Sequence, residues 1–429
     1  MLDASGRKRA QRAWCLYDWA NSAFATSVVA AILPVYFART AAKTMPAHEA
    51  TALWGYASAA ALAVTAVLSP VVGALADQSR RRKPLLLACV LLGGAGTLGL
   101  ALTPAGAWNP LLLAFAVAFI AFATGNVLYD SLLPSVATAA EMHRVSARGF
   151  AWGYIGGGLL LAVNLAMITM PQRFGLHDAA TATRASFATV AAWWLAFSLP
   201  LFRDLPEPEA ERSGVPAREL PAAVLRQLGG TLKSLSQQPD LLRFLVAFWL
   251  YSDGIGTIIK MATIYGVEVG LGDKDLMGAL LMVQIVAAPA SIVFGRLAAP
   301  LGARGAVLLG IAGYAGISIF AFFLRSPWQF WTLAALVALF QGGTQALSRS
   351  MFASLVPRAR TSEMFGFYSV SEKLAGVAGP ILFGVVTQAT HGGRLATLTL
   401  LPLFVGGAWL LSTVDLERGQ RAAAALPRA

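Results

Sequence analysis

Seven charged residues interrupt stretches of the sequence that are otherwise apolar, and they are the residues best suited to chemistry. They are Asp18, Asp130, Asp253, Lys260, Arg349, Glu372 and Lys373. If these stretches cross a bilayer, each charge costs at least about 2.5–3.5 kcal/mol to insert, so such residues mark ion or substrate pathways by default. The carboxylates could take up protons, and an acid and a base together could hold the two ends of a zwitterion.

Polar residues accompany these charges at helical spacing, since positions three, four and seven apart share one face of a helix. The four stripes are Asp18, Asn21, Ser22 and Thr26; Asn126 and Asp130; Asp253, Thr257 and Lys260; and Gln341, Gln345, Ser348 and Arg349. Two interpretations are open: the stripes line a water-filled substrate or proton pathway, or they form hydrogen-bonded seams between helices.

The surrounding sequence is too apolar for a water-soluble protein. Of its 429 residues, 57% are hydrophobic and 13% are charged, whereas soluble domains carry roughly 25% charged residues. Soluble enzymes, secreted modules, disordered proteins and nucleic-acid binders are thereby excluded. The two cysteines, Cys15 and Cys89, lie in apolar stretches and imply neither a disulfide framework nor a metal site.

We predict an all-α polytopic membrane protein with twelve spans, because a spanning helix needs about 20 mainly apolar residues. The predicted spans are 13–38, 51–74, 84–104, 109–134, 148–170, 185–202, 240–266, 276–299, 305–324, 328–356, 363–389 and 394–413. The longest polar stretch, 203–239, is predicted to be a cytoplasmic linker with a possible interfacial helix. It separates an N-terminal six-helix bundle, 1–202, from a C-terminal one, 240–429.

The basic residues predict the orientation. With the N-terminus inside, 23 of the 33 lysines and arginines fall on inner segments and 7 on outer ones, and cytoplasmic segments carry such an excess. Both termini are therefore expected in the cytoplasm, with a bacterial-type inner (plasma) membrane favoured. Anionic lipid headgroups are the expected partners of the basic loops, so the net charge of +12 does not require nucleic acid.

The two halves repeat short patterns six spans apart. The first copy reads Gly73-Ala-Leu-Ala-Asp77 followed by Arg80-Arg-Arg-Lys83, and the second reads Gly295-Arg-Leu-Ala-Ala299 with Arg304 downstream. Spans 4 and 10 end alike, at Pro134 and Pro357. Two six-span halves in register predict pseudo-two-fold symmetry about the membrane normal, an arrangement found in transporters whose substrate site lies between the halves.

The 73–83 segment resembles the loop signature of the major facilitator superfamily. The segment Leu16-Tyr17-Asp18-Trp19-Ala20-Asn21-Ser22-Ala23-Phe24 is similar to the first-helix signature of the "unknown major facilitator" branch, which includes autophagy-related vacuolar amino-acid effluxers. Parts of spans 4, 10 and 11 fit that branch as well. In the second loop Ala299 stands where the first has Asp77, so a gate is expected only in the first half.

The resemblance implies that spans 1, 4, 7 and 10 line a central cavity. It also implies that Gly73, Asp77, Arg80 and Lys83 form a gating loop, in which Asp77 contacts the positive N-terminal end of span 11. The basic residues would bind span ends or headgroups, and a plain membrane-anchor role suffices for Arg81 and Arg82.

The expected function is secondary active transport by alternating access, with proton coupling and with efflux favoured over uptake. The solute would be small and polar or zwitterionic, such as an amino acid. The alternatives are an exporter of amphipathic drugs or metabolites and, in another class, a lipid scramblase or a non-transporting sensor. The sequence carries no phosphate-binding loop and no His-Glu-x-x-His, so no cofactor, metal, enzymatic activity or obligate protein partner is expected.

Depth along the spans suggests how the charges pair. Asp130 lies near the inner end of span 4 and Arg349 about two turns inside Pro357, so one hypothesis pairs them across the halves. The alternative is a pair within one half, such as Asp18 with a nearby base.

The charges of spans 7 and 11 leave more possibilities open. Asp253 and Lys260 are two turns apart, roughly 10.5 Å, which is too far for a direct bridge. They could hold the two ends of a zwitterion, Asp253 could take up a proton, or Lys260 could extend to the outer interface. Glu372 and Lys373 are adjacent and point in different directions, so at most one of them faces the cavity squarely.

Overall fold

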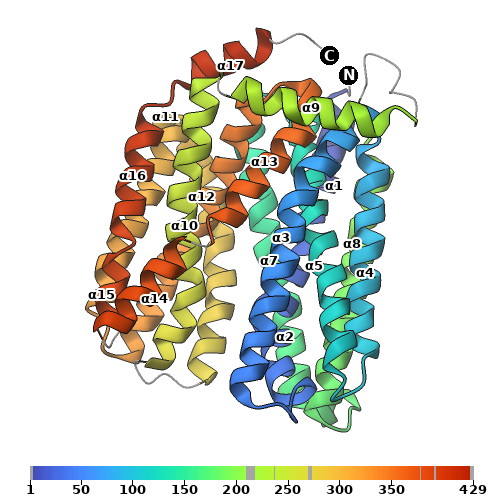
Figure 1. The fold of residues 1–429 in the computed structure, drawn as a ribbon, viewed down its shortest axis with the longest axis vertical. Helices are drawn as coiled ribbons and strands as arrows, with labels where there is room; N and C mark the ends of the chain where they lie inside the picture. Colours follow the sequence, from blue (N-terminus) through green and yellow to red (C-terminus); the bar gives the residue numbers. More distant parts are fainter. Residues whose placement is uncertain are drawn as a thin grey trace.

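The protein folds into long, roughly parallel helices, and both of its termini lie at the same end of the molecule (Figure 1). The computed structural model describes residues 3–208, 218–235, 237–268, 273–376, 378–390 and 393–425. We call the end that carries the termini the termini side and the other end the opposite side.

The first half contains one interrupted helix followed by five others. The first is α1 (Ala4–Ala23), continued by the π-helical η1 (Phe24–Ile32), by α2 (Leu33–Tyr36) and by η2 (Phe37–Ala41). Then follow α3 (Ala47–Ser79), α4 (Arg82–Leu102), α5 (Trp108–Ser131), the short α6 (Leu133–Val136), α7 (Met142–Thr169), the 3-10 turn η3 (Pro171–Phe174) and α8 (Ala179–Asp204). The first helix begins well before the predicted residue 13, because the Asp3 carboxylate accepts a hydrogen bond from the Gly6 amide at 2.7 Å and caps it.

The second half repeats this plan with more breaks. Its elements are α10 (Pro239–Glu268), α11 (Asp273–Phe322), α12 (Pro327–Leu355), η4 (Arg358–Arg360), α13 (Thr361–Leu374), α14 (Ala378–Thr390), α15 (Gly393–Leu398), α16 (Leu401–Ser412) and α17 (Leu416–Ala425). The span predicted at 363–389 is thus divided into α13 and α14.

Eleven helical stretches of the described residues are long and apolar enough to cross a membrane. One of them, α11, has 50 residues, which would extend roughly 75 Å at about 1.5 Å per residue and is far too long for one crossing. It contains the two spans predicted at 276–299 and 305–324, separated by non-helical backbone at Gly302. The protein is therefore an all-α polytopic membrane protein with the predicted twelve-helix architecture.

The turn at Gly302 gives a testable consequence. Its backbone angles, φ 69° and ψ 155°, belong to a region that is essentially restricted to glycine. Gly302→Ala should lower the free energy of unfolding by about 1–3 kcal/mol, measured by thermal unfolding of the purified protein. Gly316→Ala in the same helix is the matched control, because it is helical and has open space around it. Equal effects of the two substitutions would contradict this account.

The segment between the halves contains one described helix, α9 (Leu220–Leu235), which lies across the termini side (Figure 1). The linker residues 209–217 lie outside the described residues. On α9, the amide of Gln227 accepts a hydrogen bond from Gln78 of α3 and donates one to Glu363 of α13 at 2.5 Å. The linker helix therefore contacts both halves.

Apolar packing also joins the halves. One buried cluster contains residues from both of them, among them Trp14, Tyr129, Phe352 and Phe365. A second cluster, which includes Phe24, Phe115 and Trp194, belongs to the first half alone. The halves are thus in extensive contact on the termini side, where the charged residues described next are found.

Candidate functional site

A buried arginine bridges the two halves. The side chain of Arg349, on α12, is 5% exposed, and its Nη1 lies 2.9 Å from Oδ1 of Asp130 on α5. Its Nη2 lies 3.4 Å from Oδ2 of Asp18 on α1. The predicted contact between Asp130 and Arg349 is therefore present, and Asp18 joins it instead of pairing with a base in its own half.

Helix α7 supplies a third set of partners for this arginine. Ser146 accepts hydrogen bonds from Nε through its hydroxyl, at 2.9 Å, and from Nη2 through its carbonyl, at 3.0 Å. The ring of Phe150 lies 4.4 Å from the guanidinium carbon and that of Trp14 lies 4.7 Å away. All three nitrogens of Arg349 are thus engaged, and the flat faces of the guanidinium are covered by aromatic rings, an arrangement that stabilises a cation.

The acid on α1 is held in place by neighbours on the first half. The Tyr129 hydroxyl donates to Oδ2 of Asp18 at 2.7 Å. Trp14 donates through its indole nitrogen to the Tyr129 carbonyl at 3.1 Å and stacks on the tyrosine ring at 4.6 Å. Removing one partner from a buried ion pair typically costs about 3–5 kcal/mol, because the other charge is left uncompensated. We call Asp18, Asp130 and Arg349 the charge centre.

A second contact between the halves lies on the termini side. Asp77, at the end of α3, accepts hydrogen bonds from the backbone amides of Ser362, at 3.2 Å, and Glu363, at 2.9 Å, in the first turn of α13. A carboxylate there satisfies free amides and interacts favourably with the helix dipole. The predicted contact of Asp77 with span 11 is confirmed.

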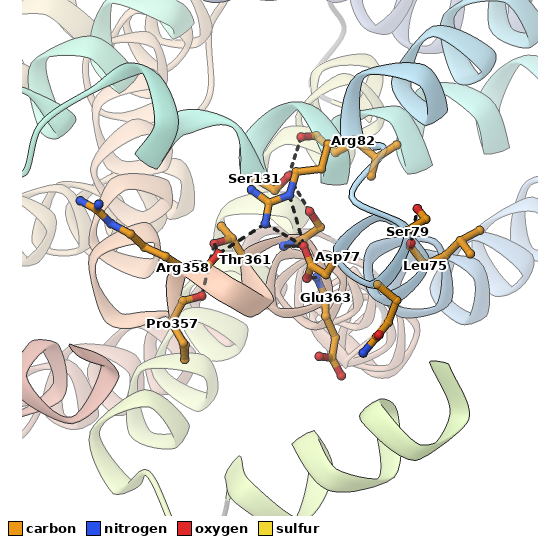
Figure 2. A network of polar contacts seen from close by, with 12 residues as sticks. Leu75, Asp77, Ser79, Arg82, Ser131, Pro357, Arg358, Thr361 and Glu363 are labelled. Atoms are coloured by element: carbon orange, nitrogen blue, oxygen red, sulfur yellow. Dashed lines mark hydrogen bonds and ion pairs between the residues drawn. The ribbon is translucent and has the colours of Figure 1, made fainter. Parts of the chain in front are cut away.

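Arg82 binds the end of a span, which is one of the two roles expected for the basic residues of this loop. Arg82 forms an ion pair with Asp77 at 2.8 Å and also donates to the carbonyl of Arg358 at 3.4 Å, across the halves (Figure 2). The sequence left both roles open, because a run of four bases next to a span looks the same whether it binds lipid or protein. Nearby, the hydroxyl of Ser362 donates to that of Ser131 at 3.0 Å.

The other gating-loop residues differ in which half of the protein they contact. Gly73 lies against the Ser362 backbone, where an added Cβ would come 2.8 Å from the Cα of Glu363. Lys83 donates to the carbonyls of Phe202, at 2.9 Å, and Leu205, so it ties α4 to the end of α8 within the first half. Arg80 ends α3 in a left-handed conformation with φ 57°. Close backbone packing and the Asp77 cap thus join α3 to α13.

A cavity of about 330 Å³ lies between the halves, toward the opposite side. Its polar lining residues are Ser22, Thr26, Tyr154, Gln284, Gln341 and Gln345. Its apolar lining includes Phe150, Ile258, Leu280, Val283, Phe330 and Leu333. The termini side is closed beneath it by the charge centre and by the contact between α3 and α13.

The elements around this cavity correct one expectation. Spans 1, 7 and 10 contribute lining residues, but span 4 (α5) does not, and its place is taken by α7 and the first part of α11. Helix α5 turns its polar residues elsewhere, since Asp130 meets Arg349 and Asn126 accepts a hydrogen bond from Asn21 at 2.6 Å. Asn21 and Asn126 therefore form the helix–helix seam that the sequence left as an alternative.

This seam can be tested by a double-mutant cycle. Asn21→Ala and Asn126→Ala should each destabilise the protein, and their coupling energy should be about 0.5–1 kcal/mol, typical of hydrogen bonds between membrane helices. Thermal unfolding of the two single variants and the double variant measures it. Strictly additive effects would show that the two amides do not act as a pair.

The charges of spans 7 and 11 gather near the junction of α13 and α14. Asp253 accepts a hydrogen bond from the Gly379 amide at 2.8 Å, and Lys260 donates to the Gly376 carbonyl at 3.3 Å. Thr257 donates to the carbonyl of Asp253 in its own helix at 2.7 Å. Helix α10 thus holds both sides of the break with groups that are two turns apart.

The two adjacent charges of span 11 differ in their surroundings. Lys373 is partly buried and donates to the Ser369 hydroxyl at 2.5 Å, whereas Glu372 is exposed. Neither of them lines the cavity, and neither do Asp253, Thr257 or Lys260. The charges predicted for one pathway therefore occupy two places, the charge centre and the break in span 11.

The chain matches the family model described as "Vacuole effluxer Atg22 like" over residues 44–424. It is 38% identical over 412 residues to the uncharacterized MFS-type transporter YxiO of Bacillus subtilis (strain 168), a match that covers 95% of each protein. It is 28% identical over 310 residues to autophagy-related protein 22 of Yarrowia lipolytica, covering 65% of this chain and 51% of the fungal protein.

Solved structures agree on the fold at low sequence identity. The proton:xylose symporter XylE, of the major facilitator superfamily, superposes with a TM-score of 0.73 at 13% identity, covering 96% of this chain and 97% of the other. The human organic anion transporter MFSD10 gives 0.71 at 16% identity, covering 94% and 99%. Both likenesses cover nearly the whole chain, so the twelve-helix arrangement extends over both halves.

Proposed function

The chain belongs to the vacuole effluxer Atg22-like family of major facilitator transporters, and on that premise we propose that it moves a small organic solute across the membrane by alternating access. The observation that carries the proposal is the charge centre, in which a base from one half is held by acids from the other. Such a contact can form and break as the halves rock, because each partner moves with its own half.

The conformation supports this mechanism. The cavity lies toward the opposite side, while the charge centre and the Asp77 contact close the termini side. Opening the termini side would require Arg349 to leave Asp130 and α13 to leave Asp77. In alternating access these contacts break and the termini side opens, while the two halves come together on the opposite side.

We further propose that solute movement is coupled to protons and runs as efflux. Asp18 and Asp130 compete for one arginine, so protonation of one acid would weaken the contact between the halves and favour opening. The direction, efflux, is proposed because the family model is described as that of an effluxer. We also propose that the termini lie in the cytoplasm, as the basic residues indicate, that the protein resides in a bacterial-type inner membrane, and that it acts without a cofactor and without chemical change of the solute.

Two classes of solute are candidates. A small polar or zwitterionic solute such as an amino acid agrees with the family, but its ammonium and carboxylate would need partners, and the charge centre does not line the cavity. An amphipathic metabolite is favoured by the cavity itself, whose lining combines aromatic and aliphatic side chains with neutral polar groups.

The test is solute movement in proteoliposomes. A comparison of metabolites in deletion and overexpression cells would supply candidate solutes, and counterflow of each would identify those that are carried. An imposed proton gradient should then drive accumulation of the solute. A lipid scramblase or a sensor on the same fold would give no accumulation against a gradient, and that outcome would reject the proposal.

A further inference from the structure

We infer that the cavity between the halves binds an uncharged amphipathic solute, one that carries amide or hydroxyl groups on an apolar body. The inference rests on the proposed function, because this cavity is the site at which a transported solute would be held. The charges and hydrogen-bonding groups of the cavity lining decide which of the two candidate classes of solute can be bound.

Charge is the first criterion. Every residue that lines the cavity in the described part of the chain is uncharged. An ionised group placed there would lose its hydration without gaining a partner of opposite charge, which is strongly unfavourable. A solute that is buried in this cavity is therefore expected to be neutral throughout and not merely neutral in sum.

The charge centre does not supply the missing partners. Phe150 lines the cavity, and its ring covers the Arg349 guanidinium at 4.4 Å. The nitrogens of Arg349 are already bound by Ser146, Asp18 and Asp130. Phe150 thus separates the cavity from the charges, and a carboxylate on the solute would have to displace both this ring and an existing partner.

Neutral hydrogen-bonding groups are the second criterion. Gln341 and Gln345 lie one turn apart on α12, and Gln284 lies on α11, all in the second half. Ser22 and Thr26 come from the first half. None of these five side chains makes a hydrogen bond to another described residue, although a primary amide alone offers two donors and an acceptor. The cavity therefore presents unused neutral donors and acceptors on both sides of a solute.

Size and apolar surface complete the description. Ile258, Leu280, Val283, Phe330 and Leu333 surround the same space of about 330 Å³. That volume is at the lower end of the range for small-molecule sites, in which a few placed polar groups fix a mostly apolar ligand. A compact apolar body with amide or hydroxyl groups fits both the volume and the chemistry.

The experiment compares four compounds that share one body and differ in charge. They are N-acetylphenylalaninamide (neutral), N-acetylphenylalanine (anionic), phenylalaninamide (cationic) and phenylalanine (zwitterionic). Binding to the purified full-length protein in nanodiscs is measured as a rise in Tm with compound concentration, because a ligand that binds the folded state raises its stability. The neutral compound is expected to raise Tm in a saturable manner, and the charged ones are expected to leave it unchanged.

Variants locate the binding. Gln345→Leu should weaken binding of the neutral compound about tenfold, as expected for the loss of one buried hydrogen bond. Gln388→Leu is the matched control, because this glutamine is exposed on α14, outside the cavity. Phe150→Ala combined with Asp130→Asn should add binding of the anionic compound, since the two substitutions remove both the ring that covers Arg349 and the charge of one of its partners. An unchanged preference in that variant would contradict the role of Phe150 as a barrier.

The inference is overturned if the neutral compound gives no shift, or if the zwitterion binds as well as the neutral compound. This readout is separate from transport. Selective binding of the neutral compound without movement of any solute would reject the proposed function and leave the binding site standing. Transport of a zwitterion without binding of the neutral compound would reject this inference and leave the proposed function standing.

Discussion

Arg349→Met is expected to abolish transport and to destabilise the conformation that is closed on the termini side. Methionine keeps much of the volume but removes the charge, which leaves Asp18 and Asp130 as two buried carboxylates without their base. Losing one partner of a buried pair typically costs about 3–5 kcal/mol. A bias of about 3 kcal/mol shifts an equilibrium between two conformations by roughly a hundredfold.

The charge swap decides whether the contact itself matters. Asp130→Arg and Arg349→Asp should each be inactive, and the double variant should recover a measurable fraction of transport, because an arginine of one half again meets an acid of the other. Counterflow in proteoliposomes measures the activity. Arg325→Met, in the exposed loop between α11 and α12, is the control and should transport normally. Full activity of Arg349→Met would show that the charge centre is not needed.

The pairing of Arg349 could be predicted from the sequence because physical chemistry leaves few choices. A guanidinium inside a membrane requires an acid, and apart from the first residues of two spans, the spans offered only Asp18, Asp130, Asp253 and Glu372. The depth of each along its span then favoured Asp130. The twelve spans could be predicted for a similar energetic reason, since long apolar segments have no stable alternative to crossing the bilayer.

The rotation of each helix about its own axis could not be predicted in the same way. In a soluble helix the apolar face marks the core, but a membrane helix is apolar toward both lipid and protein. Hydropathy therefore did not show that α7 turns Ser146 and Phe150 toward Arg349. A pattern of small residues was the available signal, since Gly149 and Gly153 allow α7 to approach α1 closely.

The break in span 11 was missed for a related reason. Gly376 and Gly379 are compatible with a continuous membrane helix as well as with an interrupted one. What distinguishes the two cases is the pair of contacts from α10, where Asp253 binds the Gly379 amide and Lys260 the Gly376 carbonyl. Those contacts satisfy backbone groups that the break leaves free, and they depend on a helix more than one hundred residues away in the sequence.

Asp77→Ala is expected to open the termini side. The substitution removes the acceptor for two amides of α13, which join the halves, and it removes the ion-pair partner within the first half that positions Arg82 against the Arg358 carbonyl of the second half. A lost helix cap typically costs about 1 kcal/mol, and the lost ion pair adds to it, so the open population should rise about tenfold or more. Transport should slow, because the closed conformation is a required step of the cycle.

The opening can be followed with a cysteine placed inside the contact. Ser362 is fully buried against Ser131, so Ser362→Cys, with Cys15 and Cys89 replaced by alanine, should react with a water-soluble maleimide only when the termini side opens. Asp77→Ala should raise the labelling rate about tenfold, in proportion to the open population. Asp178→Ala is the control, since Asp178 caps α8 in the same way at 2.7 Å but within one half. If both variants label at the rate of the parent, the contact between α3 and α13 does not hold the halves together.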